Sequence, residues 1–258
     1  LEKLAHSLSN AGQRHPREED MKVDLIVNKL LENQVKTLFT NEADKRVFEM
    51  FVEPSAHFVT NSNDDKTIAN AVVPFQAFLN LPDLRPPPSA DKRILLILGS
   101  AGSGKTTFVR RMASILCDKH RDSSKPEQKE FVASYSPAEW VPLYVYLADD
   151  RIQAQISKGL LKEAFAVFGI DESEVRFLQR QRPHVKLLLI LDGFDELNEK
   201  KDNLFDQNQI FGTASASFDV KVLVTCRSQD GFAYEQRYFR PADRPAALYR
   251  RLELDVFS

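Results

Sequence analysis

A glycine-rich segment, Gly99–Thr106, has the residue types and the spacing that bind a phosphate chain. It reads GSAGSGKT, which fits the pattern G-x-x-x-x-G-K-[ST]. Glycines let the backbone approach phosphate oxygens closely, and successive N–H groups converge on them at the positive end of the following helix. Lys105 can reach the β- and γ-phosphates, and the Thr106 hydroxyl group can bind Mg²⁺. The residues expected to contact nucleotide are Gly99, Ser100, Ala101, Gly102, Ser103, Gly104, Lys105, Thr106 and Thr107.

Three acidic residues follow the most apolar segment of the chain, Val185–Leu191. A carboxylate at the carboxyl end of a buried strand faces the ligand crevice of an open α/β sheet, so we expect Asp192 to hold Mg²⁺ together with Thr106. Asp195 and Glu196 follow within one turn, and either carboxylate can polarise the water that attacks the γ-phosphate. The alternative for Asp195 and Glu196 is an acidic helix N-terminus, where the helix dipole favours negative charge.

A single arginine, Arg227, ends another apolar segment, Val220–Cys226. At a strand end beside the crevice, its side chain can contact the γ-phosphate or the acidic cluster, and can stabilise the charge that develops during hydrolysis. The alternative is an ordinary surface arginine. We include Arg227 with Asp195 and Glu196 among the candidate catalytic residues.

Five short apolar segments alternate with segments of helical periodicity. This alternation predicts an α/β fold in which a parallel five-stranded sheet has helices on both faces. The predicted strands are Arg93–Leu98, Pro142–Leu147, Val185–Leu191, Val220–Cys226 and Arg251–Phe257. The predicted helices between them begin at Lys105, at Ala154 (to Phe168) and at Ser173 (to Arg180).

The first third of the chain has a different pattern. Apolar positions at helical spacing predict an amphipathic helix over Val23–Leu38, and Phe48–Val59 is typical of a strand or edge segment. The proline-rich stretch Pro82–Pro88 is a stiff connector. We therefore expect a mainly helical lead-in over residues 1–85 and a nucleotide-binding domain over residues 86–258.

The composition excludes several classes of partner. Lys plus Arg (35) and Asp plus Glu (37) nearly cancel, so there is no strong signal for nucleic-acid binding. No apolar run approaches the roughly 20 residues that span a bilayer. Cys117 and Cys226 both lie in apolar stretches, which is typical of buried thiols in a reducing compartment, so we expect a cytoplasmic protein.

Taken together, GSAGSGKTT, LLLILDGFDEL and VLVTCR resemble the NACHT family of P-loop NTPases, the NLR-like signalling ATPases of the STAND class. The resemblance covers roughly Arg93–Phe257 and implies that the Arg227 strand lies between the P-loop strand and the Asp192 strand. It also implies ATP or ADP and Mg²⁺ as cofactors. Such proteins normally continue into helical, winged-helix and sensor regions, so we expect this chain to be a fragment of a longer protein.

The resemblance further implies a slow ATPase that acts as a switch. Family members use ATP/ADP exchange to pass from a closed monomer to an assembled oligomer. We therefore expect self-association of the full-length protein and an unidentified protein or ligand as the trigger.

Two alternatives have other sequence support. The first is a turnover P-loop ATPase or a small-molecule kinase, since Arg176, Arg180 and Arg182 can supply an arginine-rich lid. The acidic cluster after Asp192 is unusual in such kinases. The second alternative is an interaction module that binds nucleotide only to complete its fold, and the intact Lys105 counts against it.

Overall fold

The computed structural model covers the whole chain and describes most of its second and third thirds. The described residues are 18–38, 46, 54–58, 67–68, 71, 75, 79, 93–121, 140–156, 159–181, 185–198, 203–211, 218–229, 234–239 and 249–255. The predicted connector Pro82–Pro88 lies outside them.

Five parallel strands form the body of the sheet, as the sequence predicts. They are β3 (Ile94–Gly99), β4 (Trp140–Tyr146), β5 (Lys186–Asp192), β6 (Asp219–Arg227) and β7 (Tyr249–Leu254). Their order is β7-β3-β6-β5-β4. The strand that ends in Arg227 therefore lies between the P-loop strand and the Asp192 strand, which confirms the expected topology.

Two short antiparallel strands extend this sheet on the β7 side. They are β1 (Ala56–Phe58), which pairs with β7, and β2 (Thr67–Ile68), which pairs with β1. Within the part of the chain that the structure describes, the sheet thus has seven strands, in the order β2-β1-β7-β3-β6-β5-β4. β1 lies within the segment Phe48–Val59, for which the sequence predicts a strand or edge segment, and its pairing places part of the lead-in on the main sheet.

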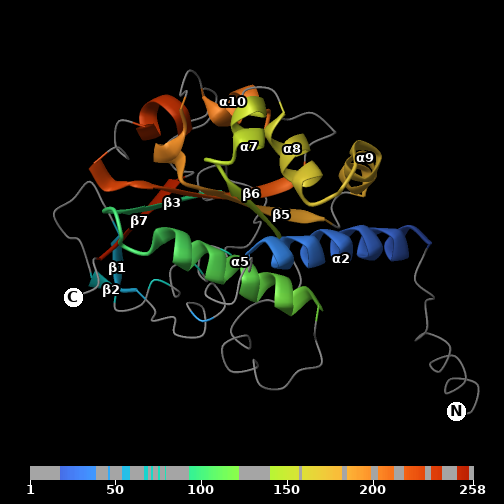
Figure 1. Cartoon of the computed structure of the whole chain (residues 1–258), viewed down its shortest axis with the longest axis horizontal. Helices are drawn as coiled ribbons and strands as arrows, with labels where there is room; N and C mark the ends of the chain where they lie inside the picture. The colour runs from blue at the N-terminus through green and yellow to red at the C-terminus, as the bar shows by residue number, and fades with distance from the viewer. Residues whose placement is uncertain are drawn as a thin grey trace, which may run out of the picture.

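Helices cover both faces of the sheet (Figure 1). Because side chains alternate along a strand, Ile94, Leu96 and Leu98 of β3 belong to one buried apolar cluster while Leu95 and Ile97 belong to another. The second cluster includes residues of α5 (Lys105–Arg121). The first includes residues of α7 (Asp150–Gln155), α8 (Leu160–Val167), α9 (Glu172–Arg180) and α10 (Leu204–Gln207).

The predicted single helix over Ala154–Phe168 is wrong, because α7 and α8 are separate helices. Gly159 lies between them with φ −164°, far from helical geometry. Asn208 stabilises this break, since its Oδ1 accepts a hydrogen bond from the Leu160 amide at 2.9 Å and its Nδ2 donates to the Ile156 carbonyl at 2.7 Å.

The lead-in helix α2 (Glu18–Leu38) confirms the predicted amphipathic helix and lies along the β4 edge of the sheet. Gln34 is fully buried there, and its side-chain amide donates to the Pro142 carbonyl at 3.1 Å while its Oε1 accepts from the Tyr144 amide at 2.7 Å. The N–H and C=O of one strand residue point to the same side, so the missing N–H of Pro142 would have faced α2 and not β5. An edge strand tolerates proline in this orientation.

No helix in the described ranges is long and apolar enough to cross a membrane.

Candidate nucleotide-binding site

The glycine-rich segment forms a tight loop between β3 and α5. β3 ends at Gly99 and α5 begins at Lys105. Gly102 and Gly104 have φ of +78° and +82°, a left-handed conformation that residues with a Cβ rarely adopt. The Lys105 ammonium group donates to the carbonyls of Gly99 and Ser100, both at 2.8 Å. The loop therefore curls around its own lysine at the positive end of α5.

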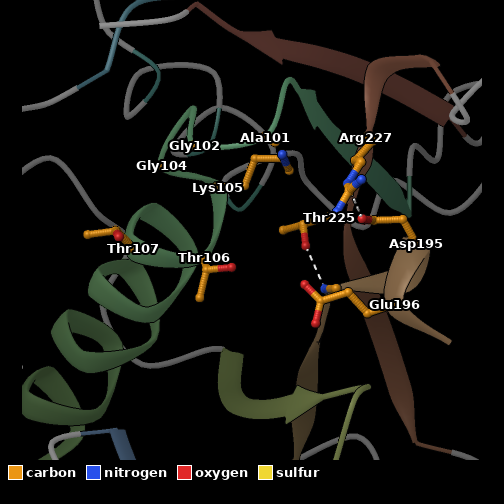
Figure 2. Close-up of a pocket in the computed structure, with 11 residues that line it drawn as sticks. Ala101, Gly102, Gly104, Lys105, Thr106, Thr107, Asp195, Glu196, Thr225 and Arg227 are labelled. Atoms are coloured by element: carbon orange, nitrogen blue, oxygen red, sulfur yellow. Dashed lines mark hydrogen bonds and ion pairs between the residues drawn. The ribbon is translucent and has the colours of Figure 1, made fainter.

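A pocket of about 330 Å³ opens where the loop meets the carboxyl ends of β5 and β6 (Figure 2). Its lining combines loop residues with acidic, hydroxyl and guanidinium side chains from the two strand ends. These residues are Ala101, Gly102, Gly104, Lys105, Thr106, Thr107, Gly193, Asp195, Glu196, Thr225 and Arg227. Ligands of open α/β sheets bind at this edge.

Four of the predicted site residues do not line this pocket. Gly99 and Ser100 precede it, and the side chain of Ser103 is fully buried in the body of the protein. Asp192 is also fully buried and lies behind Thr106 and Thr225. The other predicted residues all line this one pocket.

Hydroxyl groups from three elements surround the Asp192 carboxylate. Thr225 of β6 donates to its Oδ1 at 2.6 Å, and Tyr144 of β4 donates to its Oδ2 at 2.8 Å. Thr106 of α5 also donates to Oδ1, at 3.3 Å. Burial raises the pKa of Asp192, and these three hydrogen bonds oppose that rise. Burial also raises the pKa of Tyr144, so its hydroxyl group remains a donor.

The two acidic residues after Asp192 have different partners. Asp195 pairs with Arg227, with 2.8 Å between Oδ2 and Nε (Figure 2). The Asp195 side chain is 8% exposed and that of Arg227 is 46% exposed, so the acid is anchored while the guanidinium keeps access to the pocket. Glu196 accepts a hydrogen bond on Oε2 from the Tyr146 hydroxyl group at 2.7 Å.

Charges across the pocket act on the Lys105 ammonium group. Burial lowers the pKa of Lys105, and the Asp195 carboxylate is the largest influence in the opposite direction. An anionic ligand in the pocket would favour the charged form of this lysine in the same way as Asp195 does. The pocket is therefore suited to an anion.

The residues present fit a phosphate chain and a magnesium ion. The loop offers backbone amides at a helix N-terminus and an ammonium group, which bind phosphate oxygens. Thr106 and Asp192 offer adjacent oxygen ligands of the type that Mg²⁺ prefers. Within the described residues there is no group of three or more His, Cys, Asp or Glu side chains that could hold a metal ion. Nucleotide oxygens and water would therefore complete the magnesium shell.

Three residues of this site have no role that follows from the sequence alone. They are Tyr144, Tyr146 and Thr225, whose hydroxyl groups contact the acidic residues. Thr225 carries a recognisable signal, because it is a polar residue near the end of an otherwise apolar strand. The tyrosines carry none, since an aromatic residue is ordinary in a strand.

The fold and the pocket define a P-loop nucleotide-binding protein. The family model of the NACHT domain matches residues 93–236, more than half of the chain, so the chain belongs to the NACHT domain family. This assigns it to the nucleotide-binding signalling NTPases of the STAND class.

Two curated proteins show local similarity to the chain. Disease resistance-like protein DSC2 of Arabidopsis thaliana is 27% identical in a match of 169 residues that covers 61% of this chain and 13% of that protein. An uncharacterised WD repeat-containing protein of Nostoc sp. is 30% identical over 139 residues, 54% of this chain and 8% of that protein. The chain thus spans a small part of each relative.

Proposed function

We propose that the chain is the nucleotide-dependent switch of a larger signalling protein. It binds Mg-ATP, hydrolyses it slowly, and its ATP or ADP state controls assembly with further copies of the full-length protein. Thr106 and Asp192 hold Mg²⁺, Glu196 or Asp195 acts as the general base, and Arg227 responds to the γ-phosphate. Asp195 is the weaker candidate for the base because Arg227 occupies its carboxylate.

The observation that carries this proposal is the Asp195–Arg227 ion pair in the wall of the pocket. A γ-phosphate would compete with the Asp195 carboxylate for the same guanidinium group, and ADP has no group to do so. Arg227 would then have two alternative partners, one for each nucleotide state. A charged side chain with two exclusive partners is a common basis for nucleotide-dependent switching.

The position of α9 argues against the small-molecule kinase, although Arg182 of the suggested lid lies outside the described residues. Arg176, one of the arginines suggested for a lid, pairs with Glu172 on its own helix α9. Figure 1 shows α9 at the end of the molecule away from the start of α5, where the P-loop lies. A lid from α9 would have to extend from that end of the molecule to reach the nucleotide.

The remaining expectations are proposals at the level of the full-length protein. We propose that residues 1–85 form a lead-in to a nucleotide-binding domain over residues 86–258. An unidentified protein or ligand would trigger assembly, and the disease resistance-like relative favours a signalling output. Cys117 and Cys226 are buried thiols that form no disulfide, which supports a cytoplasmic location.

Replacing the proposed base separates binding from hydrolysis. Glu196→Gln keeps the size and hydrogen-bonding ability of the side chain but removes its basicity. We expect single-turnover hydrolysis of radiolabelled Mg-ATP to slow by about 100-fold, the lower range of general-base effects. The affinity for a fluorescent ATP analogue should change by less than about twofold, because the phosphate ligands are intact.

Glu32→Gln is the matched control, since Glu32 is exposed on α2 and outside the pocket. It should hydrolyse ATP at the wild-type rate. If Glu196→Gln also does so, the base is another residue, and Asp195→Asn is then the variant to measure.

A further inference from the structure

The edge strand β4 carries two tyrosines that reach the two functional carboxylates next to it. Tyr144 and Tyr146 are two residues apart, so they project from the same face of the strand. Tyr144 donates to Asp192, the proposed magnesium ligand, and Tyr146 donates to Glu196, the proposed base. β4 lies directly beside β5, with Tyr146 opposite Asp192 in the register.

Two residues, Gly193 and Tyr146, lie in close contact with the Glu196 side chain. Its carboxyl group and the Tyr146 ring both lie close to the backbone of Gly193. A Cβ atom at position 193 would lie 3.4 Å from Glu196 Cδ and 3.4 Å from Tyr146 Cε2. Gly193 also has φ +79°, so an alanine there would be strained. The glycine and the tyrosine together define where the glutamate side chain lies.

The Tyr146–Glu196 hydrogen bond determines the orientation of an otherwise exposed carboxylate. The bond engages Oε2 and so restricts the rotamers that the carboxylate can adopt. The hydrogen bond and burial raise the pKa of Tyr146 to about 12, so the phenol stays protonated and remains a donor at neutral pH. Glu196 lines the pocket, where Figure 2 shows its carboxyl group on the side facing Thr106.

Packing does not explain the position of Tyr146. Its side chain is one of the three large hydrophobic groups that are exposed among the described residues, at 42%. A tyrosine with this exposure contributes modestly to the core, whereas Tyr144 two residues earlier is buried. The clearest contact of the Tyr146 hydroxyl group is the Glu196 carboxylate.

We propose that Tyr146 is a positioning residue for hydrolysis, whose hydroxyl group holds the Glu196 carboxylate toward the water that attacks the γ-phosphate. This inference rests on the proposed role of Glu196 as the general base. Tyr146 itself touches neither nucleotide nor water in this scheme and acts only through the glutamate. Loss of its hydroxyl group would let Glu196 adopt other rotamers and leave the phosphate-binding groups unchanged.

The variant Tyr146→Phe tests this role, because it keeps the ring and removes only the hydroxyl group. We expect kcat for Mg-ATP hydrolysis to fall roughly tenfold, as mispositioned catalytic groups do. KM and the affinity for a non-hydrolysable ATP analogue should stay within about twofold, because no phosphate ligand changes. Tyr238→Phe applies the same change at a buried residue outside the pocket and should leave kcat unchanged.

A double-mutant cycle with Glu196→Gln separates positioning from folding effects. If Tyr146 acts through Glu196, adding Tyr146→Phe to Glu196→Gln should lower kcat by less than about twofold further. An equal drop in both backgrounds, or a wild-type kcat in Tyr146→Phe while Glu196→Gln is slow, would overturn the positioning role alone. A wild-type rate in Glu196→Gln would overturn the proposed base and the positioning role with it.

Discussion

Asp192 shows how the protein stabilises a buried carboxylate at the centre of its site. The side chain is fully buried, and a buried charge is costly unless hydrogen bonds replace its water. Thr225, Tyr144 and Thr106 supply those bonds from three different elements. Thr225 also accepts a hydrogen bond from the Gly193 amide at 2.8 Å, so the same hydroxyl group fixes the turn after β5. Thr225 therefore contacts both the carboxylate and the turn that carries the proposed base.

Arg227 should determine how well the chain distinguishes ATP from ADP. We expect Arg227→Ala to lower the ratio of ATP affinity to ADP affinity by about tenfold, a typical loss for one charge-assisted hydrogen bond. The affinity for ADP should change little, since ADP has no γ-phosphate for the arginine to contact. Competition titrations with a fluorescent nucleotide measure both affinities in the same samples.

Arg176→Ala is the matched control for this comparison, because Arg176 is exposed and pairs within α9. Its ATP to ADP affinity ratio should equal that of the wild type. A wild-type ratio in Arg227→Ala as well would identify Arg227 as a surface arginine with a structural partner and would remove the basis for the switch.

At the scale of elements, the lead-in helix α2 covers the edge strand β4 of the sheet. An edge strand exposes unpaired backbone groups, and Gln34 satisfies two of them with one side chain. Lys29 adds an ion pair to Glu174 of α9 at 2.9 Å, and Asn33 donates to the Phe168 carbonyl at 2.9 Å. Gln34 thus binds α2 to the strand that carries both site tyrosines, and Lys29 and Asn33 bind it to α9 and to Phe168.

Removing the Gln34 side chain should destabilise the fold. Gln34→Ala leaves the Pro142 carbonyl and the Tyr144 amide without this partner in a buried position, so we expect the free energy of unfolding to fall by about 2–3 kcal/mol. Thr37→Ala, an exposed change on the same helix, should alter it by less than about 0.5 kcal/mol. Urea denaturation followed by circular dichroism measures both. Equal effects of the two changes would show that Gln34 does not hold α2 against β4.

The elements that the sequence predicts well are those whose pattern is local. The strands of the parallel sheet are continuous apolar runs because both faces are buried, and the P-loop has a fixed spacing because phosphate geometry requires it. The sequence does not predict the break between α7 and α8, because the contacts that stabilise it come from Asn208, which is distant in sequence. The contacts of Tyr144 and Tyr146 likewise depend on which strand lies next to β4. The order of strands in the sheet decides this, and a local sequence pattern does not reveal that order.

At the scale of the whole molecule, the site lies at the carboxyl ends of the central strands β3, β5 and β6, and two described parts of residues 1–85 lie on opposite edges of the sheet. β1 and β2 extend the sheet beyond β7, while α2 covers β4 at the opposite edge. Residues before the NACHT match at 93–236 are thus packed against the nucleotide-binding fold. A change in the site that moved β4 would also move α2, since the Gln34 side chain is hydrogen-bonded to the backbone of that strand.

The measurement that tests the switch most directly is the nucleotide content of the purified chain. The purified protein is denatured and the released nucleotide is identified by anion-exchange chromatography. A switch that retains its hydrolysis product should release close to one ADP per chain. Lys105→Ala should release almost none, because loss of one charged phosphate ligand weakens binding by roughly 10- to 150-fold. An empty wild-type chain, or equal nucleotide content in the two proteins, would contradict the proposal that this P-loop holds the nucleotide of a resting switch.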